Sequence, residues 1–215
     1  MATARAYLGA WKEATLSFLD HLLIVCLAVG LPALAAGVAS HNLLESDPDF
    51  GPWLLVRTAM DLLIIPVALA AAMRMSREES FFRPGLGEVV GELLGNSRRL
   101  LAVSLVLIVL LHPAMLFVVG LPLVWLALWL LQPVRWLEGG SLWRGGGGWK
   151  ILLASAPLWL GAPAGLIAGV YFDVEIARQS TALMMGLEQV VRGLLFTWAW
   201  VVLMRLYRVH DPAFA

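Results

Sequence analysis

The chain has 215 residues, of which 60% are hydrophobic and 14% are charged, and its mean hydropathy is +0.83. Soluble domains are about 45–50% apolar and about 25% charged, so this composition excludes a soluble globular protein. Fifteen basic and fifteen acidic residues leave a formal net charge of zero. The chain as a whole therefore has no electrostatic attraction to nucleic acid.

The apolar residues gather in blocks of about 20, the length that an α-helix needs to cross ~30 Å of hydrocarbon. We therefore predict an all-α integral membrane protein, a single polytopic domain built as a bundle of six transmembrane helices. The first block is too long for the apolar core of a signal peptide, about 7–15 residues, and is expected to be retained as a span. The predicted spans are residues 15–39, 53–73, 100–119, 121–137, 151–171 and 187–206.

Basic residues indicate how these spans are oriented. With six spans, both termini share one side of the membrane with the segments 74–99 and 138–150. Twelve of the fifteen basic residues fall on that side: Arg5, Lys12, Arg74, Arg77, Arg83, Arg98, Arg99, Arg135, Arg144, Lys150, Arg205 and Arg208. The other side has only Arg57, Arg178 and Arg192. The positive-inside rule thus predicts cytoplasmic termini and a multi-pass protein of a bacterial inner membrane.

Several intramembrane residues stand out from their apolar surroundings. Arg57 and Asp61 are four residues apart and share a helix face; they form either a functional polar site or an ion pair near the outer interface, with Arg57 reaching the headgroups. The repeat of Gly161, Gly165 and Gly169 favours close packing against another helix. Prolines inside or beside the spans are expected to bend several helices: Pro32, Pro66, Pro113, Pro133, Pro157 and Pro163.

The spacing of the histidine and cysteine residues does not indicate a metal or cofactor site. Four scattered histidines and one cysteine lack metal-ligand spacing, so we predict no metal site and no cofactor. The single cysteine, Cys26, cannot form an intramolecular disulfide and is interpreted as a small buried hydrophobe.

The segment Glu78-Glu79-Ser80-Phe81-Phe82-Arg83 matches the Glu-Glu-x-x-x-Arg motif of CAAX-type (CPBP) intramembrane proteases, which it resembles. That resemblance implies Glu78, Glu79, Arg83 and His112 as a catalytic set that activates water. The chain departs from the family at Ile108, where a phenylalanine is expected, and it lacks the family's third element at the start of the span 151–171. His112 serves equally well as a donor to a carbonyl freed by Pro113. We expect Glu78 and His112 to lie more than about 8 Å apart, beyond the reach of one bridging water.

A broader resemblance covers most of the chain. Three segments resemble the membrane domain of the glycerophosphoryl-diester-phosphodiesterase and YciC-like families. They are the N-terminal segment ARAYLGAWKEATLSFLDH, the amphipathic stretch GLGEVVGELLGNSRRLL and the motif QPVRWLEGG. This resemblance implies a six-helix module without catalytic residues of its own. The predicted function is a non-enzymatic scaffold or accessory subunit whose partner is membrane lipid, another integral membrane protein or a second copy. The CPBP-type protease is the alternative, and a small dimeric transporter is a third hypothesis.

Overall fold

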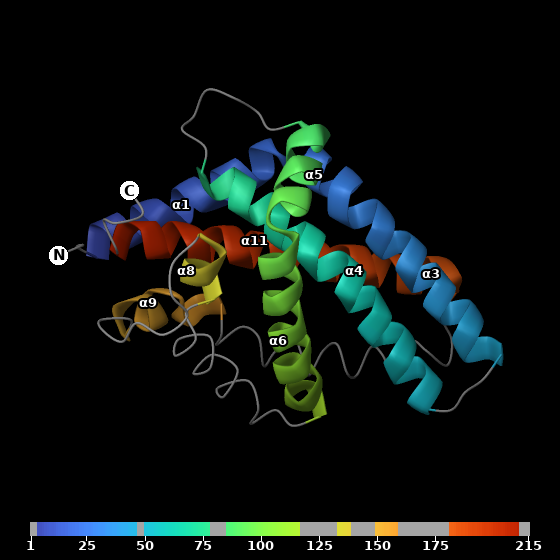
Figure 1. Cartoon of the computed structure of the whole chain (residues 1–215). Helices are drawn as coiled ribbons and strands as arrows, with labels where there is room; N and C mark the ends of the chain where they lie inside the picture. Colours follow the sequence, from blue (N-terminus) through green and yellow to red (C-terminus); the bar gives the residue numbers. More distant parts are fainter. Residues whose placement is uncertain are drawn as a thin grey trace.

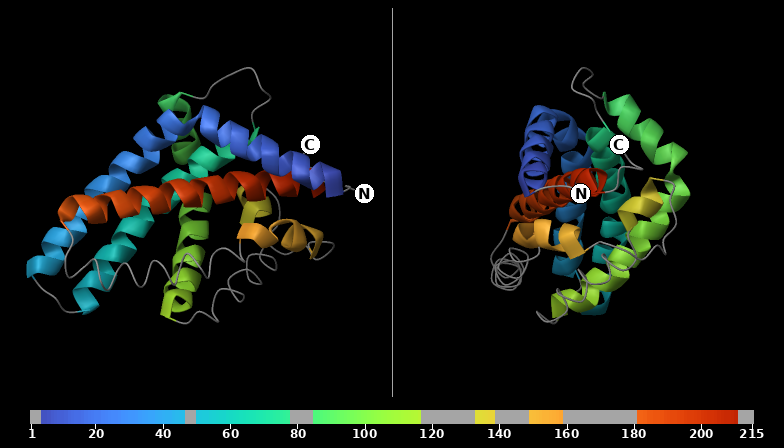
Figure 2. Two further views of the ribbon diagram at one scale, coloured as in Figure 1. Left: turned by 180° about the vertical axis from the view of Figure 1, so that it is seen from behind. Right: turned by 90° about the vertical axis from the view of Figure 1, so that its left-hand side faces the viewer.

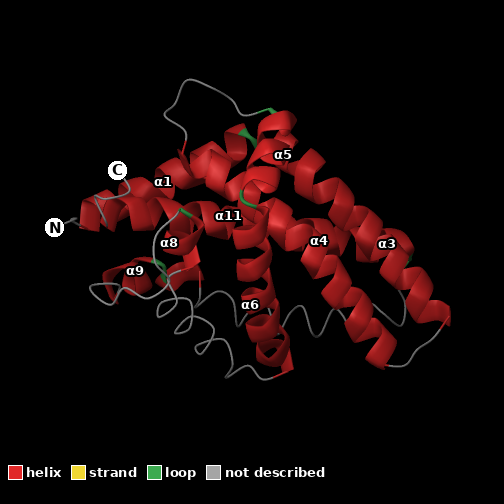
Figure 3. Cartoon of the chain, viewed as in Figure 1, coloured by secondary structure: helices red, strands yellow, loops and turns green. Residues whose placement is uncertain are grey.

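The computed structural model describes residues 4–46, 50–77, 85–116, 133–138, 149–158 and 181–210. Within these ranges the regular structure is helical and contains no strand (Figure 3). In this described part, three helices are long and apolar enough to cross a membrane, or four if a bent pair is counted as one span. The predicted all-helical class is therefore confirmed in the described part, whereas the number of six spans stays a prediction.

The N-terminal region differs from the single span predicted over residues 15–39. Helix α1, Ala4–Asp20, ends at a turn on His21, and the apolar helix long enough to cross a membrane runs over Leu22–Asn42. A turn at His21 thus divides the predicted span, and α1 before it is an amphipathic helix that buries Ala10, Ala14 and Phe18 and exposes its charged side chains. The ring of His21 stabilises the break, since its Nδ1 donates to the carbonyl oxygen of Ser17 at 2.6 Å.

The apolar helix after this turn changes its hydrogen-bonding pattern ahead of a proline. It consists of α2, Leu22–Val25, a π-helical turn, Cys26–Gly30, and α3, Leu31–Ser46. In a regular α-helix the ring of Pro32 would clash with the carbonyl group four residues earlier, that of Ala28. The wider π-helical turn contains Ala28, so the helix accommodates Pro32 without ending.

Helix α11, Ala182–His210, lies at the centre of the described bundle (Figures 1 and 2). Its first half packs against α3 and its second half against α1, and α4, Phe50–Arg77, also packs on it. Helix α4 remains one helix of 28 residues although Pro66 lies inside it. The N- and C-terminal ends of the described chain lie together (Figure 1), where the hydroxyl of Tyr7 is 2.9 Å from Nδ1 of His210.

Glycines allow α3 and α11 to approach each other closely. A Cβ atom added at Gly37 would lie 2.6 Å from the carbonyl oxygen of Met185 and 2.7 Å from the Cα atom of Gly186. Gly193 on α11 faces side chains instead, since its added Cβ would lie 2.9 Å from a methyl group of Val29 in the π-helical turn that precedes α3. Distances below 3.0 Å are shorter than real Cβ contacts, so the backbones of α3 and α11 can meet at Gly37 and Gly186 because neither residue has a side chain.

The remaining described helices pack on α4 or on α11. Helix α5, Leu86–Gly95, and helix α6, Ser97–Leu116, pack on α4 and are bent by 84° relative to each other (Figure 2). Two short helices follow, α8, Pro133–Leu137, and α9, Trp149–Ala154, and both pack on α11. Most of the predicted spans 121–137 and 151–171 lies outside the described residues.

Candidate functional site

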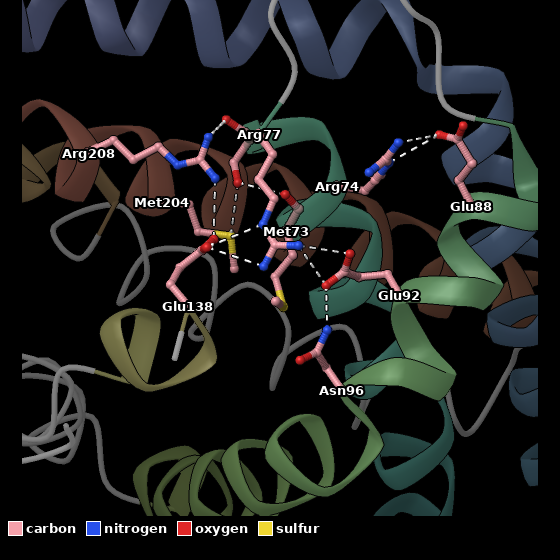
Figure 4. A network of polar contacts seen from close by, with 10 residues as sticks. Met73, Arg74, Arg77, Glu88, Glu92, Asn96, Glu138, Met204 and Arg208 are labelled. Atoms are coloured by element: carbon pink, nitrogen blue, oxygen red, sulfur yellow. Dashed lines mark hydrogen bonds and ion pairs between the residues drawn. The ribbon is translucent and has the colours of Figure 1, made fainter. Parts of the chain in front are cut away.

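The most extensive polar cluster in the described part of the chain lies where α4 and α11 end. The last turn of α4 carries Arg74 and Arg77, and the last turns of α11 carry Arg205 and Arg208. Cationic side chains are favoured at helix C-termini because the unpaired carbonyl groups there are partly negative. Local sequence therefore places four arginines at one end of the bundle, and Figure 4 shows three of them, Arg74, Arg77 and Arg208.

Two glutamates of α5 bind the arginines of α4. Both Nε and Nη2 of Arg74 donate to Oε2 of Glu88, at 3.1 and 2.9 Å. Nη1 of Arg77 donates to both carboxylate oxygens of Glu92, each at 3.0 Å. The amide of Asn96 also donates to Glu92, at 2.6 Å, so this carboxylate is held from two sides. These contacts attach α5 to the end of α4.

A third glutamate, Glu138, joins two helices at once. Its Oε2 accepts a hydrogen bond from Nε of Arg77 at 3.2 Å, and its Oε1 accepts one from Nη2 of Arg208 at 3.3 Å. The Glu138 side chain is only 12% exposed, and that of Glu92 only 8%. A partly buried carboxylate is costly unless it is paired. Each of these two has arginine partners, and Arg77 is shared between them.

The arginines of α11 also cap α4. Arg208 donates through Nη1 to the carbonyl oxygen of Ser76, and Arg205 donates through Nη2 to that of Met75 at 3.4 Å. Both carbonyl groups belong to the last turn of α4, where the helix itself supplies no donor. The buried hydroxyl of Ser76 in turn donates to the carbonyl oxygen of Met73 at 2.9 Å. The C-terminus of α4 is thus held by side chains from another helix.

We call Arg74, Arg77, Glu88, Glu92, Asn96, Glu138, Arg205 and Arg208 the arginine–glutamate network. It joins α4, α5, α11 and the residue that follows α8, and its guanidinium groups donate to acceptors of the chain itself. Charge-assisted and bidentate contacts of this kind fix geometry as well as contributing energy. The arrangement is suited to holding helix ends in fixed positions.

The residues predicted as a protease site lie largely outside the described structure. Glu78, Glu79 and Arg83 fall in the segment 78–84, which is not described, and only the backbone of His112 is described, within α6. The separation of Glu78 and His112 therefore stays a prediction. The structure brings the neighbouring Arg77 to Glu92 and Glu138.

The other predicted residues have similar outcomes. Arg57 and Asp61 both lie on α4, one turn apart, and Asp61 is partly buried, but the side chain of Arg57 is not described. Their pairing stays a prediction. Gly161, Gly165 and Gly169 lie outside the described residues. Among the described residues, no three His, Cys, Asp or Glu side chains form a group that could hold a metal ion.

Two features escaped the sequence analysis. The two glycines of α11 that face α3 and the turn before it, Gly186 and Gly193, follow a seven-residue spacing, which is about two helical turns and a recognisable signal. The arginine–glutamate network has a weaker signal: Glu88 and Glu92 share one face of an amphipathic stretch that follows two arginines. The pairing of Glu138 with Arg208 has no local signal, because 70 residues separate them.

Comparison with known proteins found no protein-family model, no curated protein and no solved structure that matches the chain. The class of protein is therefore inferred from the fold alone. The described part is an all-helical bundle whose helices include three, or four with the bent pair, of membrane-crossing length and composition. These helices define the class of a helical membrane protein. The arginine–glutamate network lies at the end of the bundle where the first and last described residues meet.

Proposed function

We propose that the chain is a non-enzymatic membrane scaffold or accessory subunit, with six spans and cytoplasmic termini, that packs against lipid or another membrane protein. The observation that carries the proposal is the arginine–glutamate network. Glu138 accepts hydrogen bonds from Arg77 of α4 and Arg208 of α11, and Arg77 also binds Glu92 of α5. A network that fixes helix ends in this way provides a rigid platform for a partner. The resemblance to six-helix membrane modules without catalytic residues supports the same function.

The decisive experiment compares cells that make the wild-type chain, a Glu78→Gln/His112→Ala double variant or a Glu138→Gln variant. Membrane levels of the three proteins are matched first. Chemical cross-linking then measures complexes, and terminal-peptide proteomics measures proteolysis in the same membranes. A scaffold should keep its cross-linked complexes in the double variant and lose them in Glu138→Gln, because only the second substitution weakens the network.

Two results would overturn this function. If the wild-type chain forms no cross-linked complex with any membrane protein, the accessory-subunit role is wrong. If terminal peptides present with the wild type disappear only in the double variant, the chain is a protease that depends on Glu78 and His112. Proteolysis would also require the two side chains to share one water, within about 3 Å of it.

Orientation is tested separately with impermeant thiol reagents. In a Cys26→Ala background, a cysteine at the exposed Ala4 should not react when the reagent is applied outside spheroplasts, since twelve of fifteen basic residues are predicted to be cytoplasmic. A cysteine at Ser46, the last residue of α3, should react because it lies at the opposite end of the first predicted span. The reverse pattern would contradict the predicted topology.

A further inference from the structure

Helix α5 has three distinct faces. One face packs on the bundle through Val89, which is 3% exposed, and through the two glutamates that bind arginines of α4. A second face presents Leu86, Val90 and Leu94, which are 46%, 46% and 70% exposed. These three residues are four apart and form a continuous apolar stripe. The ion pairs of α5 are thus directed inward, and much of its apolar surface is directed outward.

The direction of α5 differs from that of the helix that follows it. Helix α6 is the longer member of the pair, with 20 residues against 10, and α5 is bent from it by 84°. Membrane-crossing helices tilt by about 20° on average from the membrane normal, and at most by about 40°. If α6 crosses the membrane at the average tilt, α5 lies at least about 64° from the normal and so closer to the membrane plane. Ten residues give α5 a length of about 15 Å, too short to span the hydrocarbon.

Two arginines stand at the corner between these helices. Arg98 and Arg99 follow α5 directly in the first turn of α6, and both are exposed. Among the described residues neither takes part in an ion pair. An apolar stripe beside exposed arginines is typical of helices that lie in the interface of a membrane with anionic lipid headgroups.

We infer that α5 is an in-plane helix that inserts Leu86, Val90 and Leu94 into the surface of an anionic leaflet. Arg98 and Arg99 bind the phosphate groups of its lipids. The ion pairs of Arg74 and Arg77 with Glu88 and Glu92 hold α5 at the angle this contact requires, and they neutralise the two carboxylates that anionic lipid would repel. This inference goes beyond the proposed scaffold function, because it assigns a lipid class to one surface whatever the protein partner.

The third face of α5 supplies the control. Gly87, Gly91 and Gly95 line it, and a Cβ atom added at any of them meets nothing within 4 Å. A spin label at Gly91 therefore fits without disturbing the helix, at about 100° around the helix from Val90. The two positions are neighbours in sequence and differ in the face that they report.

The experiment uses the full chain in a Cys26→Ala background, with a spin label at Val90 or at Gly91. Each protein is placed as one copy per nanodisc of phosphatidylcholine alone or with about 30% phosphatidylglycerol, the anionic component. Collision with oxygen reports contact with hydrocarbon, and collision with a water-soluble nickel chelate reports exposure to water. We expect the Val90 label to collide mainly with oxygen and the Gly91 label mainly with nickel. Phosphatidylglycerol should reduce nickel access at Val90 by about twofold, an effect that salt weakens because it screens the arginines.

The variant Arg98→Gln/Arg99→Gln should lose this response to phosphatidylglycerol, while a label at Leu105 on the exposed side of α6 stays in contact with hydrocarbon. Equal nickel access at Val90 and Gly91 in both lipid mixtures would overturn the inference. Protection of Val90 only in nanodiscs that hold two copies would also overturn it, since a second copy and not lipid would then cover the stripe. A response to phosphatidylglycerol that persists in the double arginine variant would show that these arginines do not bind the headgroups.

Discussion

The α3–α11 pair and helix α5 both carry regularly spaced glycines, yet they are held in the protein by different forces. Between α3 and α11 the backbones nearly touch at Gly37 and Gly186, and dispersion contacts and apolar burial hold the pair. On α5 the glycines face open space, and ion pairs to α4 hold the helix. The same residue type at regular spacing therefore marks a packed interface in one region and an open face in the other.

The largest effect is expected from enlarging the packed glycine. Gly37→Leu should lower the free energy of unfolding by about 3 kcal/mol, because its Cβ would overlap the backbone at Met185 and Gly186, which cannot yield like a flexible side chain. The matched variant Gly91→Leu places the same side chain on the open face of α5 and should not lower stability, because leucine is a better helix former than glycine and meets no neighbour there. Thermal unfolding of both purified proteins in detergent checks this. Equal loss of stability in the two variants would show that the close approach does not hold the α3–α11 pair together.

A smaller effect is expected from weakening the ion pairs. Glu138→Gln keeps the shape of the side chain but removes the charge shared by Arg77 and Arg208. We expect a loss of about 2 kcal/mol, between the ~3–5 kcal/mol of a fully buried pair and the ~0–1 kcal/mol of an exposed one.

Glu88→Gln is the control for this substitution. Its partner is Arg74, and the two side chains are 47% and 36% exposed, so the loss should stay below about 1 kcal/mol. Chemical denaturation of both variants at low and high salt measures the difference. An equal loss in the two variants would mean that the partial burial of Glu138 adds nothing to the strength of its pairs.

The smallest effect is expected from replacing glycine by alanine, and the change in stability should have opposite signs in α5 and in the α3–α11 pair. Gly91→Ala should raise stability by about 0.5–1 kcal/mol, because alanine is the better helix former and its methyl group meets no neighbour. Gly186→Ala should lower it by about 1 kcal/mol, since the added Cβ would lie 2.7 Å from Cδ1 of Leu34 and 3.1 Å from the Leu34 carbonyl oxygen. Unfolding temperatures of the pair give the answer. If Gly186→Ala stabilised the protein, the contact between Gly186 and Leu34 would be looser than the structure shows.

Local sequence was sufficient to predict the nature of the helices. Apolar blocks such as 53–73 and 187–206 are long enough to cross a bilayer whatever they pack against, and helices of that kind are present as α4 and α11. Their exact limits were less predictable. The apolar block predicted as a span from residue 15 is divided by a turn at His21, and α1, which ends at Asp20, packs on α11. A hydropathy average cannot distinguish an amphipathic helix that lies on a bundle from the start of a span.

By itself, the sequence determined that this chain is helical and apolar and that most of its basic residues lie on one side of its predicted spans, because these properties depend on composition and on neighbours within a few turns. Tertiary structure alone decided which glycines are packed and which charges are paired. Arg77 and Glu138 are 61 residues apart, Glu138 and Arg208 are 70 apart, and Tyr7 and His210 are 203 apart. Contacts over such separations depend on how whole helices approach one another, and that approach is fixed by the combined packing of all of them rather than by any one segment.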